Sequence, residues 1–163
     1  MPMSFKKRPL EHEGVAFLLA QVGAHAAAKF AERLQRLKLT PADAGILRII
    51  SRGSNPSQQA LADRLGMFPS RLVLLLDELE AAGLVERRAS ASDRRVVALH
   101  LTARGTRTLE QIGRVAQEHR ADLCAALTER ERASLARLLA KIAAQQKMTP
   151  GVHPGYARWR RDT

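Results

Sequence analysis

The residue types that carry catalysis and metal binding are scattered along this chain. The histidines show none of the spacings by which proteins bind zinc. The sequence also contains no Gly-rich phosphate loop, no nucleophile elbow, no His-Glu-x-x-His motif and no paired catalytic carboxylates. We therefore expect no metal, no cofactor and no enzymatic activity. The five histidines are His12, His25, His100, His119 and His153.

Cys124 is the single cysteine, which rules out an intramolecular disulfide and a multi-cysteine zinc site. No second cysteine is present to resolve a sulfenic acid, so a packing role is favoured over redox sensing. No apolar stretch approaches the ~20 residues of a membrane span. The apolar segment 15–22 behind the basic N-terminus is short and lacks a cleavage site. These features predict a soluble, cytoplasmic protein.

Basic residues carry the clearest chemical signal. Lys and Arg total 27 against 16 Asp and Glu, for a formal charge of +11, and they recur from Lys6 to Arg161. This distribution favours a polyanionic partner, although a basic surface that only confers solubility would look the same. The elements that position these residues must distinguish the two.

The length of 163 residues, 45% of them apolar, predicts a single domain over 1–163. From Glu13 to Leu37 apolar residues step by three or four, which predicts a long amphipathic helix. Thr40, Pro41 and Asp43 form a helix start signal, and the helix should run to Gly53. A similar signal at 55–58 opens a short helix that stops at Gly66.

A further helix is predicted over Pro69–Ala82, with Leu72, Leu76 and Leu79 on its apolar face. Two short helices joined by a tight turn form a helix-turn-helix. The β-prone runs 84–88 and 97–101 then flank a small, polar and basic segment, which predicts a hairpin, or wing. The predicted fold class is mainly α with a small β-hairpin wing (α+β), and residues 40–102 form a winged helix-turn-helix.

Two long helices flank this unit, over 10–38 and 103–147, the second interrupted by a capping box at 128–131. Their apolar stripes are longer than the small central unit can cover. We expect them to be dimerisation helices that pair with those of a second copy. The basic segment 148–163 shows no helical period and is expected to be flexible.

Several short motifs, in this order and at these spacings, resemble the MarR (multiple antibiotic resistance regulator) family over residues 13–146. They are Leu39-Thr40-Pro41, Leu61-Ala62 with Leu65-Gly66, the run 79–87 (LEAAGLVER), Ser92-Asp93-Arg94-Arg95 and the run 101–105 (LTARG). The resemblance implies a dimeric transcriptional regulator with a winged helix-turn-helix.

In such a fold the helix 69–82 enters the major groove, and Pro69 and Ser70 lie at its leading end. If Leu72, Leu76 and Leu79 face the core, then Ser70, Arg71, Leu74 and Leu75 point towards DNA. Arg71 would bind guanine bidentately or meet a phosphate. Leu74 and Leu75 depart from the family pattern: either they contact thymine methyl groups or they pack in the core.

Other DNA contacts are predicted outside this helix. The resemblance assigns Arg94 to the minor groove, whose negative potential attracts a guanidinium, with Asp93 holding the loop through Arg95. Gln58 and Gln59, with Ser57, can meet phosphates at a helix start or act as ordinary caps. Arg64, Arg87, Arg88 and the tail arginines are expected to add non-specific attraction.

The family resemblance also implies a small, often aromatic effector between the dimerisation helices and the DNA-binding lobe. The candidate lining residues are His25, Lys29, Arg48 and His119, with apolar walls from Val22, Ala26 and Ile112.

The predicted function is that of a sequence-specific regulator, a repressor by family habit. Two recognition helices should read half-sites of an inverted repeat about 10 base pairs apart. An architectural protein that coats double-stranded DNA without a specific site is the alternative.

Overall fold

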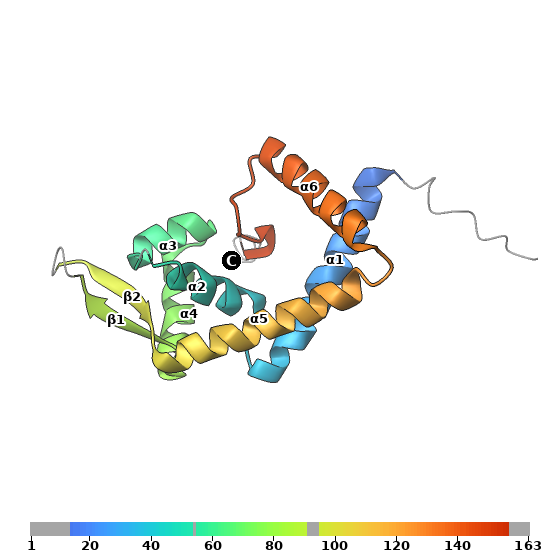
Figure 1. Ribbon diagram of the computed structural model, residues 1–163. Coiled ribbons are helices and arrows are strands. Elements are labelled where there is room, and N and C mark those ends of the chain that lie inside the picture. Colours follow the sequence, from blue (N-terminus) through green and yellow to red (C-terminus); the bar gives the residue numbers. More distant parts are fainter. Residues whose placement is uncertain (1–13, 54, 91–94, 157–163) are drawn as a thin grey trace, which may run out of the picture.

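The computed structural model describes residues 14–53, 55–90 and 95–156 of the chain. Figure 1 shows a helical body with a two-stranded hairpin at one end and with α6 and the start of α1 towards the other. The elements are α1 (Val15–Leu34), the 3-10 turn η2 (Gln35–Leu37), α2 (Pro41–Ser51), α3 (Gln58–Leu65), α4 (Pro69–Ala81), β1 (Val85–Ala89), β2 (Val97–Leu101), α5 (Ala103–Leu123) and α6 (Glu129–Gln145). The predicted mainly α fold with a β-hairpin wing is confirmed.

Short polar side chains start most of these helices. The Thr40 hydroxyl accepts a hydrogen bond from the Asp43 amide at 3.2 Å, while the Asp43 carboxylate accepts one from the Thr40 amide at 2.8 Å. Thr128 and Glu131 form the same reciprocal pair at the start of α6. Such caps satisfy amides that have no partner within the helix.

The first helix ends earlier than its apolar period suggests. α1 stops at Leu34, the chain tightens into η2, and Lys38 adopts a left-handed conformation with φ 56°. The Leu39 amide then donates to the Leu34 carbonyl at 3.3 Å. Because Leu34 and Leu39 are both buried, the turn brings two apolar side chains into the core rather than continuing the helix outward.

The hairpin is antiparallel, with a register that runs from Val85↔Leu101 to Ala89↔Val97. The Leu99 amide donates to the Pro56 carbonyl at 3.1 Å, so the segment before α3 adds to the outer edge of β2. The wing is therefore fixed through the middle of β2 to the segment before α3, while the predicted tip residues Asp93 and Arg94 lie outside the described residues.

The core lies where α2, α3, α4 and the hairpin meet. Its largest fully buried side chains come from every one of these elements and from the end of α1. They are Leu34, Ile46, Leu47, Leu61, Leu65, Leu72, Leu76, Val85 and Leu99. Ile112 and Val115 of α5 close this core from the side.

The flanking helices keep apolar side chains in solvent. Val15 in α1 is 71% exposed, Leu138 in α6 is 49% exposed, and none of the described residues of α6 is buried. Leu135, Leu139 and Ile142 share the exposed apolar stripe of α6. These stripes are the surfaces that the sequence predicts to pair with a second copy.

No described helix is both long and apolar enough to cross a lipid bilayer. Within the same residues, no cluster of three or more histidine, cysteine or carboxylate side chains could hold a metal ion.

The start of α5 is clamped to the end of the helix-turn-helix. The Thr102 hydroxyl donates to the Gly83 carbonyl at 2.6 Å, and the Thr102 amide donates to the Leu84 carbonyl at 3.1 Å. Gly105, one turn into α5, packs so closely that a Cβ at this position would overlap the Leu84 carbonyl oxygen.

We expect Gly105→Ala to destabilise the fold by about 1–3 kcal/mol, because the backbone it meets cannot move without disturbing the clamp. Gly113→Ala, in the middle of the same helix, meets nothing within 4 Å. It should stabilise by about 0.5–1 kcal/mol through helix propensity. Urea unfolding of both variants measures the difference, and equal midpoints would contradict this packing.

Candidate nucleic-acid interface and adjoining cavity

Helix α4, which the sequence predicts to be the recognition helix, begins after a tight turn. Gly66 ends α3 in the left-handed region with φ 62°, and Pro69 occupies the first turn of α4, where a missing amide hydrogen costs nothing. Met67 is buried in the turn. Pro69 and Ser70 are exposed, as expected for residues at the leading end of the helix.

The two adjacent leucines of α4 have different environments. Leu74 is 58% exposed, whereas Leu75 is 6% exposed and belongs to the core. The prediction that Leu75 points outward is therefore wrong. Leu75 follows Leu72 by three residues and precedes Leu79 by four, so it falls on the edge of a buried stripe that is wider than the three leucines assigned to it.

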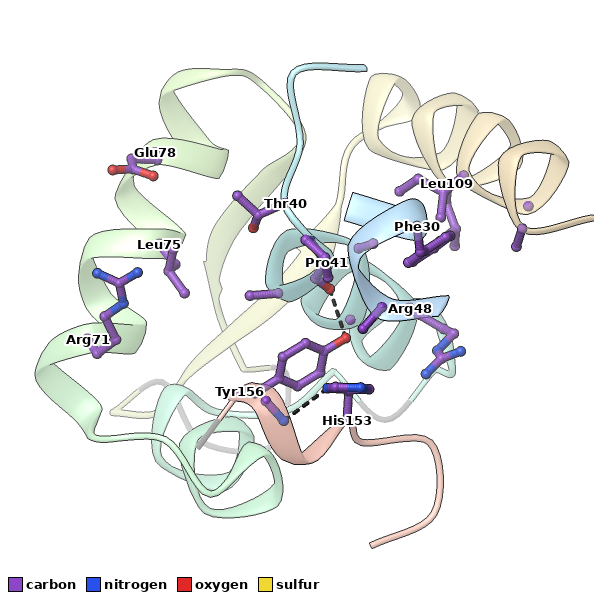
Figure 2. Close-up of a pocket in the computed structure, with 18 of the residues that line it drawn as sticks. Phe30, Thr40, Pro41, Arg48, Arg71, Leu75, Glu78, Leu109, His153 and Tyr156 are labelled. Atoms are coloured by element: carbon purple, nitrogen blue, oxygen red, sulfur yellow. Dashed lines mark hydrogen bonds between the residues drawn. The ribbon is translucent and has the colours of Figure 1, made fainter. Parts of the chain in front are cut away.

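Arg71 is half-buried on the flank of α4 rather than on its most exposed side. Figure 2 shows its guanidinium on the same side of the helix as Leu75 and Glu78. Arg71 therefore reaches both the leading end of α4 and the cavity described below.

Arg87 on β1 braces α4, α3 and the hairpin together. Its guanidinium donates to Asp77 at 2.7 Å, to Glu80, and to the Gln58 side-chain oxygen at 2.7 Å. Burial opposes the charge, but hydrogen bonds and attraction from Asp77 and Glu80 outweigh it and raise the pKa of Arg87.

The expectation that Arg87 provides only non-specific attraction is wrong. Asp77 and Glu80, three residues apart on one helix, were a signal that a nearby cation would be held there.

The other predicted DNA-contacting residues differ in their surroundings. The Gln58 side chain is engaged within the protein, because it accepts the hydrogen bond from Arg87. Gln59 donates to Asp63 at 2.8 Å and stays exposed, and Ser57 caps α3 by accepting from the Ala60 amide at 3.2 Å. Of the wing-tip residues, only Arg95 is described, and it is exposed.

A cavity of about 930 Å³ lies between the flanking helices and the helix-turn-helix. Figure 2 shows Phe30 and Leu109 on one side of it, α4 on the other, and Tyr156 close to α2. Its walls are mostly apolar, and its charged or titratable lining residues are Arg48, Arg71, Glu78, His153 and Tyr156. Its volume and composition are those of a small-molecule site.

The predicted effector residues separate in the structure. Arg48 and the predicted wall residue Ile112 line this cavity. Lys29 instead pairs with Glu32 on the surface at 3.1 Å, and His119 packs on the Phe30 ring, with the ring centres 5.4 Å apart. His25 is an electrostatic neighbour of His119 and does not line the cavity.

The C-terminal segment was expected to be flexible from residue 148, but residues 149–156 return to α2. Tyr156 donates a hydrogen bond to the Pro41 carbonyl at 2.8 Å and lines the cavity. The contact could not be foreseen because no periodicity links two residues that lie 115 positions apart.

Known proteins resemble the chain over most of its length. The MarR family model matches residues 37–96, from the end of η2 into the wing. A Thauera aromatica protein, named as a transcriptional regulatory protein for the hcr operon, is 34% identical over 112 residues, which is 69% of this chain and 68% of that protein. This chain belongs to the MarR family. It is a transcriptional regulator and not an enzyme.

Solved MarR-family structures have the same fold. The transcriptional repressor CouR, bound to a 23-mer DNA duplex, matches with a TM-score of 0.71 and 30% identity, over 83% of this chain and 96% of that one. Rv2887 of Mycobacterium tuberculosis, in complex with p-aminosalicylic acid, matches with a TM-score of 0.65 and 30% identity, over 80% and 98%.

Leu75→Ala is expected to destabilise the protein by about 2–5 kcal/mol, because it leaves a hole in the core. Leu74→Ala removes the same atoms from a solvent-exposed position and should change stability by less than about 0.5 kcal/mol. Thermal or urea unfolding of the pair measures this. A large loss for Leu74→Ala with none for Leu75→Ala would reverse the assigned orientation of α4.

Burial of His119, the positive charge of Arg33 and that of His25 lower its pKa below the ordinary 6.5, against an opposing pull from Asp122. The unfolded chain then binds more protons than the native one at mildly acidic pH. The contribution of neutral His119 to the free energy of unfolding is therefore complete above pH 6.5. It is lost as the pH falls through 6.5 towards the pKa of His119 in the native protein.

We therefore expect the free energy of unfolding to fall less between pH 7.5 and 5.5 in His119→Gln than in the unaltered protein. Urea unfolding at constant ionic strength checks this. Identical slopes for the two proteins would show that His119 does not contribute.

Proposed function

We propose that this MarR-family regulator represses transcription by binding an inverted-repeat DNA site as a homodimer, and that a small aromatic molecule in the cavity releases it. The observation that carries the proposal is the exposed side of α4. Its leading residues and Leu74 face solvent while four leucines hold the opposite side in the core. A helix held in this way can enter a major groove without unfolding its own core.

The contacts proposed for α4 follow from this orientation. Leu74 contacts thymine methyl groups, which are the apolar feature of the major groove. Ser70 and Arg71 contact base edges or phosphates at the leading end, and Gln59 contacts phosphates at the start of α3. Arg87 supports this role because it fixes the wing and α4 to one another.

The wing completes the interface in this proposal. Arg94 enters the minor groove and Arg95 contacts the backbone, with Asp93 organising the two guanidinium groups. The formal charge of +11 adds attraction that is independent of sequence.

The exposed apolar stripes of α1 and α6 support the homodimer. A monomer would leave Val15, Leu138 and their neighbours in water, at about 25 cal/mol for each Å² of apolar surface. A two-fold dimer places two copies of α4 on one face, which matches the symmetry of an inverted repeat.

The position of the cavity supports release by an effector. It lies between α1 and α5, which belong to the flanking unit, and α2 and α4, which belong to the DNA-binding unit. A molecule that prefers one spacing of these units shifts the dimer towards that spacing. Its apolar walls and Arg48 suit a flat aromatic ring with an anionic group, the chemistry of the p-aminosalicylic acid bound by Rv2887.

Selection of bound fragments from random DNA by the purified protein tests the function. We expect one inverted repeat, and Arg94→Ala should weaken binding to it by about 1–3 kcal/mol. Arg137→Ala removes the same charge from an exposed site on α6 and should leave the selected sequence unchanged. Recovery of fragments with no common sequence would instead indicate an architectural DNA-binding protein.

A further inference from the structure

The segment that follows α6 is seated on α2. We call residues 149–156 the C-terminal strap. Arg48 donates a hydrogen bond to the Gly151 carbonyl at 2.5 Å, and the Tyr156 hydroxyl donates to the Pro41 carbonyl at 2.8 Å. The strap is therefore held at two separate points along the same helix.

Apolar packing and local turns reinforce this seat. Val152 and Tyr156 pack against the core as partly buried side chains. The Val152 amide donates to the Thr149 carbonyl at 3.2 Å, and the Tyr156 amide donates to the His153 carbonyl at 3.0 Å. The rings of His153 and Tyr156 lie 5.9 Å apart. The strap thus has its own folded shape where it contacts α2.

Gly45 provides the seat for the Tyr156 ring. A Cβ on Gly45 would lie 2.7 Å from the phenol oxygen and 2.9 Å from Cε2. Any other side chain would have to displace the ring. A glycine in the middle of a helix is unfavourable for helix stability, and this contact supplies a physical reason for one here.

The electrostatic surroundings favour the neutral phenol that makes this bond. Burial and the nearby charge of Asp43 raise the pKa of Tyr156, against the opposing effect of Arg48. The hydroxyl therefore remains a hydrogen-bond donor to the Pro41 carbonyl throughout the neutral range.

The strap is also a wall of the cavity. His153, Gly155 and Tyr156 line it. Figure 2 shows His153 and Tyr156 beside α2, below Phe30 and Leu109 in the view. The other walls belong to α1, α2, α4 and α5, and each of these helices contributes buried side chains to the core. Among the described residues, the strap contributes only the partly buried Val152 and Tyr156, which makes it the wall of lowest stability.

We propose that the C-terminal strap is a partial lid on the cavity, which narrows its mouth when Tyr156 sits on Gly45 and widens it when the ring leaves. A small apolar molecule enters and leaves faster through the wider mouth. Because the strap directly follows α6, closing the lid also ties the DNA-binding unit to a helix of the flanking unit. Control of an effector by the lid rests on the proposed function, whereas the docking and opening of the strap do not.

Gly45→Ala tests the lid in the full-length protein, because the added methyl group should unseat the ring without altering the strap. Hydrogen–deuterium exchange of peptides spanning 148–156 should show protected amides in the unaltered protein and lost protection in the variant. Stopped-flow binding of the dye 8-anilinonaphthalene-1-sulfonate should be faster. If the strap is docked in about nine molecules in ten, the rise is at most about tenfold.

Gly23→Ala is the matched control. Gly23 lies in α1 outside the residues that line the cavity, and a methyl group there meets nothing within 4 Å, so strap exchange and dye binding should remain those of the unaltered protein. Tyr156→Ala should open the lid like Gly45→Ala, while Tyr156→Phe, which keeps the ring, should open it less. Ala116→Phe in the Gly45→Ala background should suppress the fast dye phase, since it fills the cavity.

Strap amides that exchange as fast as an unstructured chain in the unaltered protein would overturn the docking. Loss of protection in Gly45→Ala and Tyr156→Ala with unchanged dye kinetics would overturn the lid. Neither experiment uses DNA. A failure of the unaltered protein to select an inverted repeat would therefore defeat the proposed function and leave this result as it stands.

Discussion

Burial of four leucines along one side of α4 is the constraint on which the rest of the structure depends. Leu72, Leu75, Leu76 and Leu79 fix the rotation of the helix, and this rotation alone decides that Leu74 faces solvent. Arg87 then holds the wing against the side of α4 that carries Asp77 and Glu80. The side that carries Arg71 and Glu78 forms a wall of the cavity. One helix is thus shared by the core, the proposed DNA-facing surface and the candidate effector site.

Much of the fold could be predicted because the signals are local. Thr40, Thr102 and Thr128 mark helix starts, and each accepts a hydrogen bond from an amide three residues further on. Alternation in 97–101 indicated the strand that pairs with β1. The period of an apolar stripe shows that a helix has a buried side, but it does not show how many residues wide that side is. Leu75 was assigned to the exposed side of α4 because the buried stripe was taken to be narrower than it is.

The contacts that could not be predicted all join distant parts of the chain. Arg87 bonds to Gln58, 29 positions earlier, and its role depends on a tertiary arrangement that charge counting does not reveal. The seat of Tyr156 on Gly45 depends on the path taken after α6, and the sequence of that segment has no periodicity. Three of the four proposed effector residues do not line the cavity: His119 packs on the Phe30 ring, while His25 and Lys29 are exposed on α1, and the helical period does not show which side of α1 faces the cavity.

The clamp between Thr102 and the carbonyls of Gly83 and Leu84 has an evolutionary consequence. It anchors the start of α5 to the residues that precede the hairpin, so the two ends of the wing are fixed beside each other independently of what lies between them. Insertions or deletions beyond Ser90 can therefore change the reach of the wing without shifting α5 or reshaping the cavity. In proteins descended from one ancestral chain, the length of the wing and the shape of the cavity can therefore evolve independently of each other.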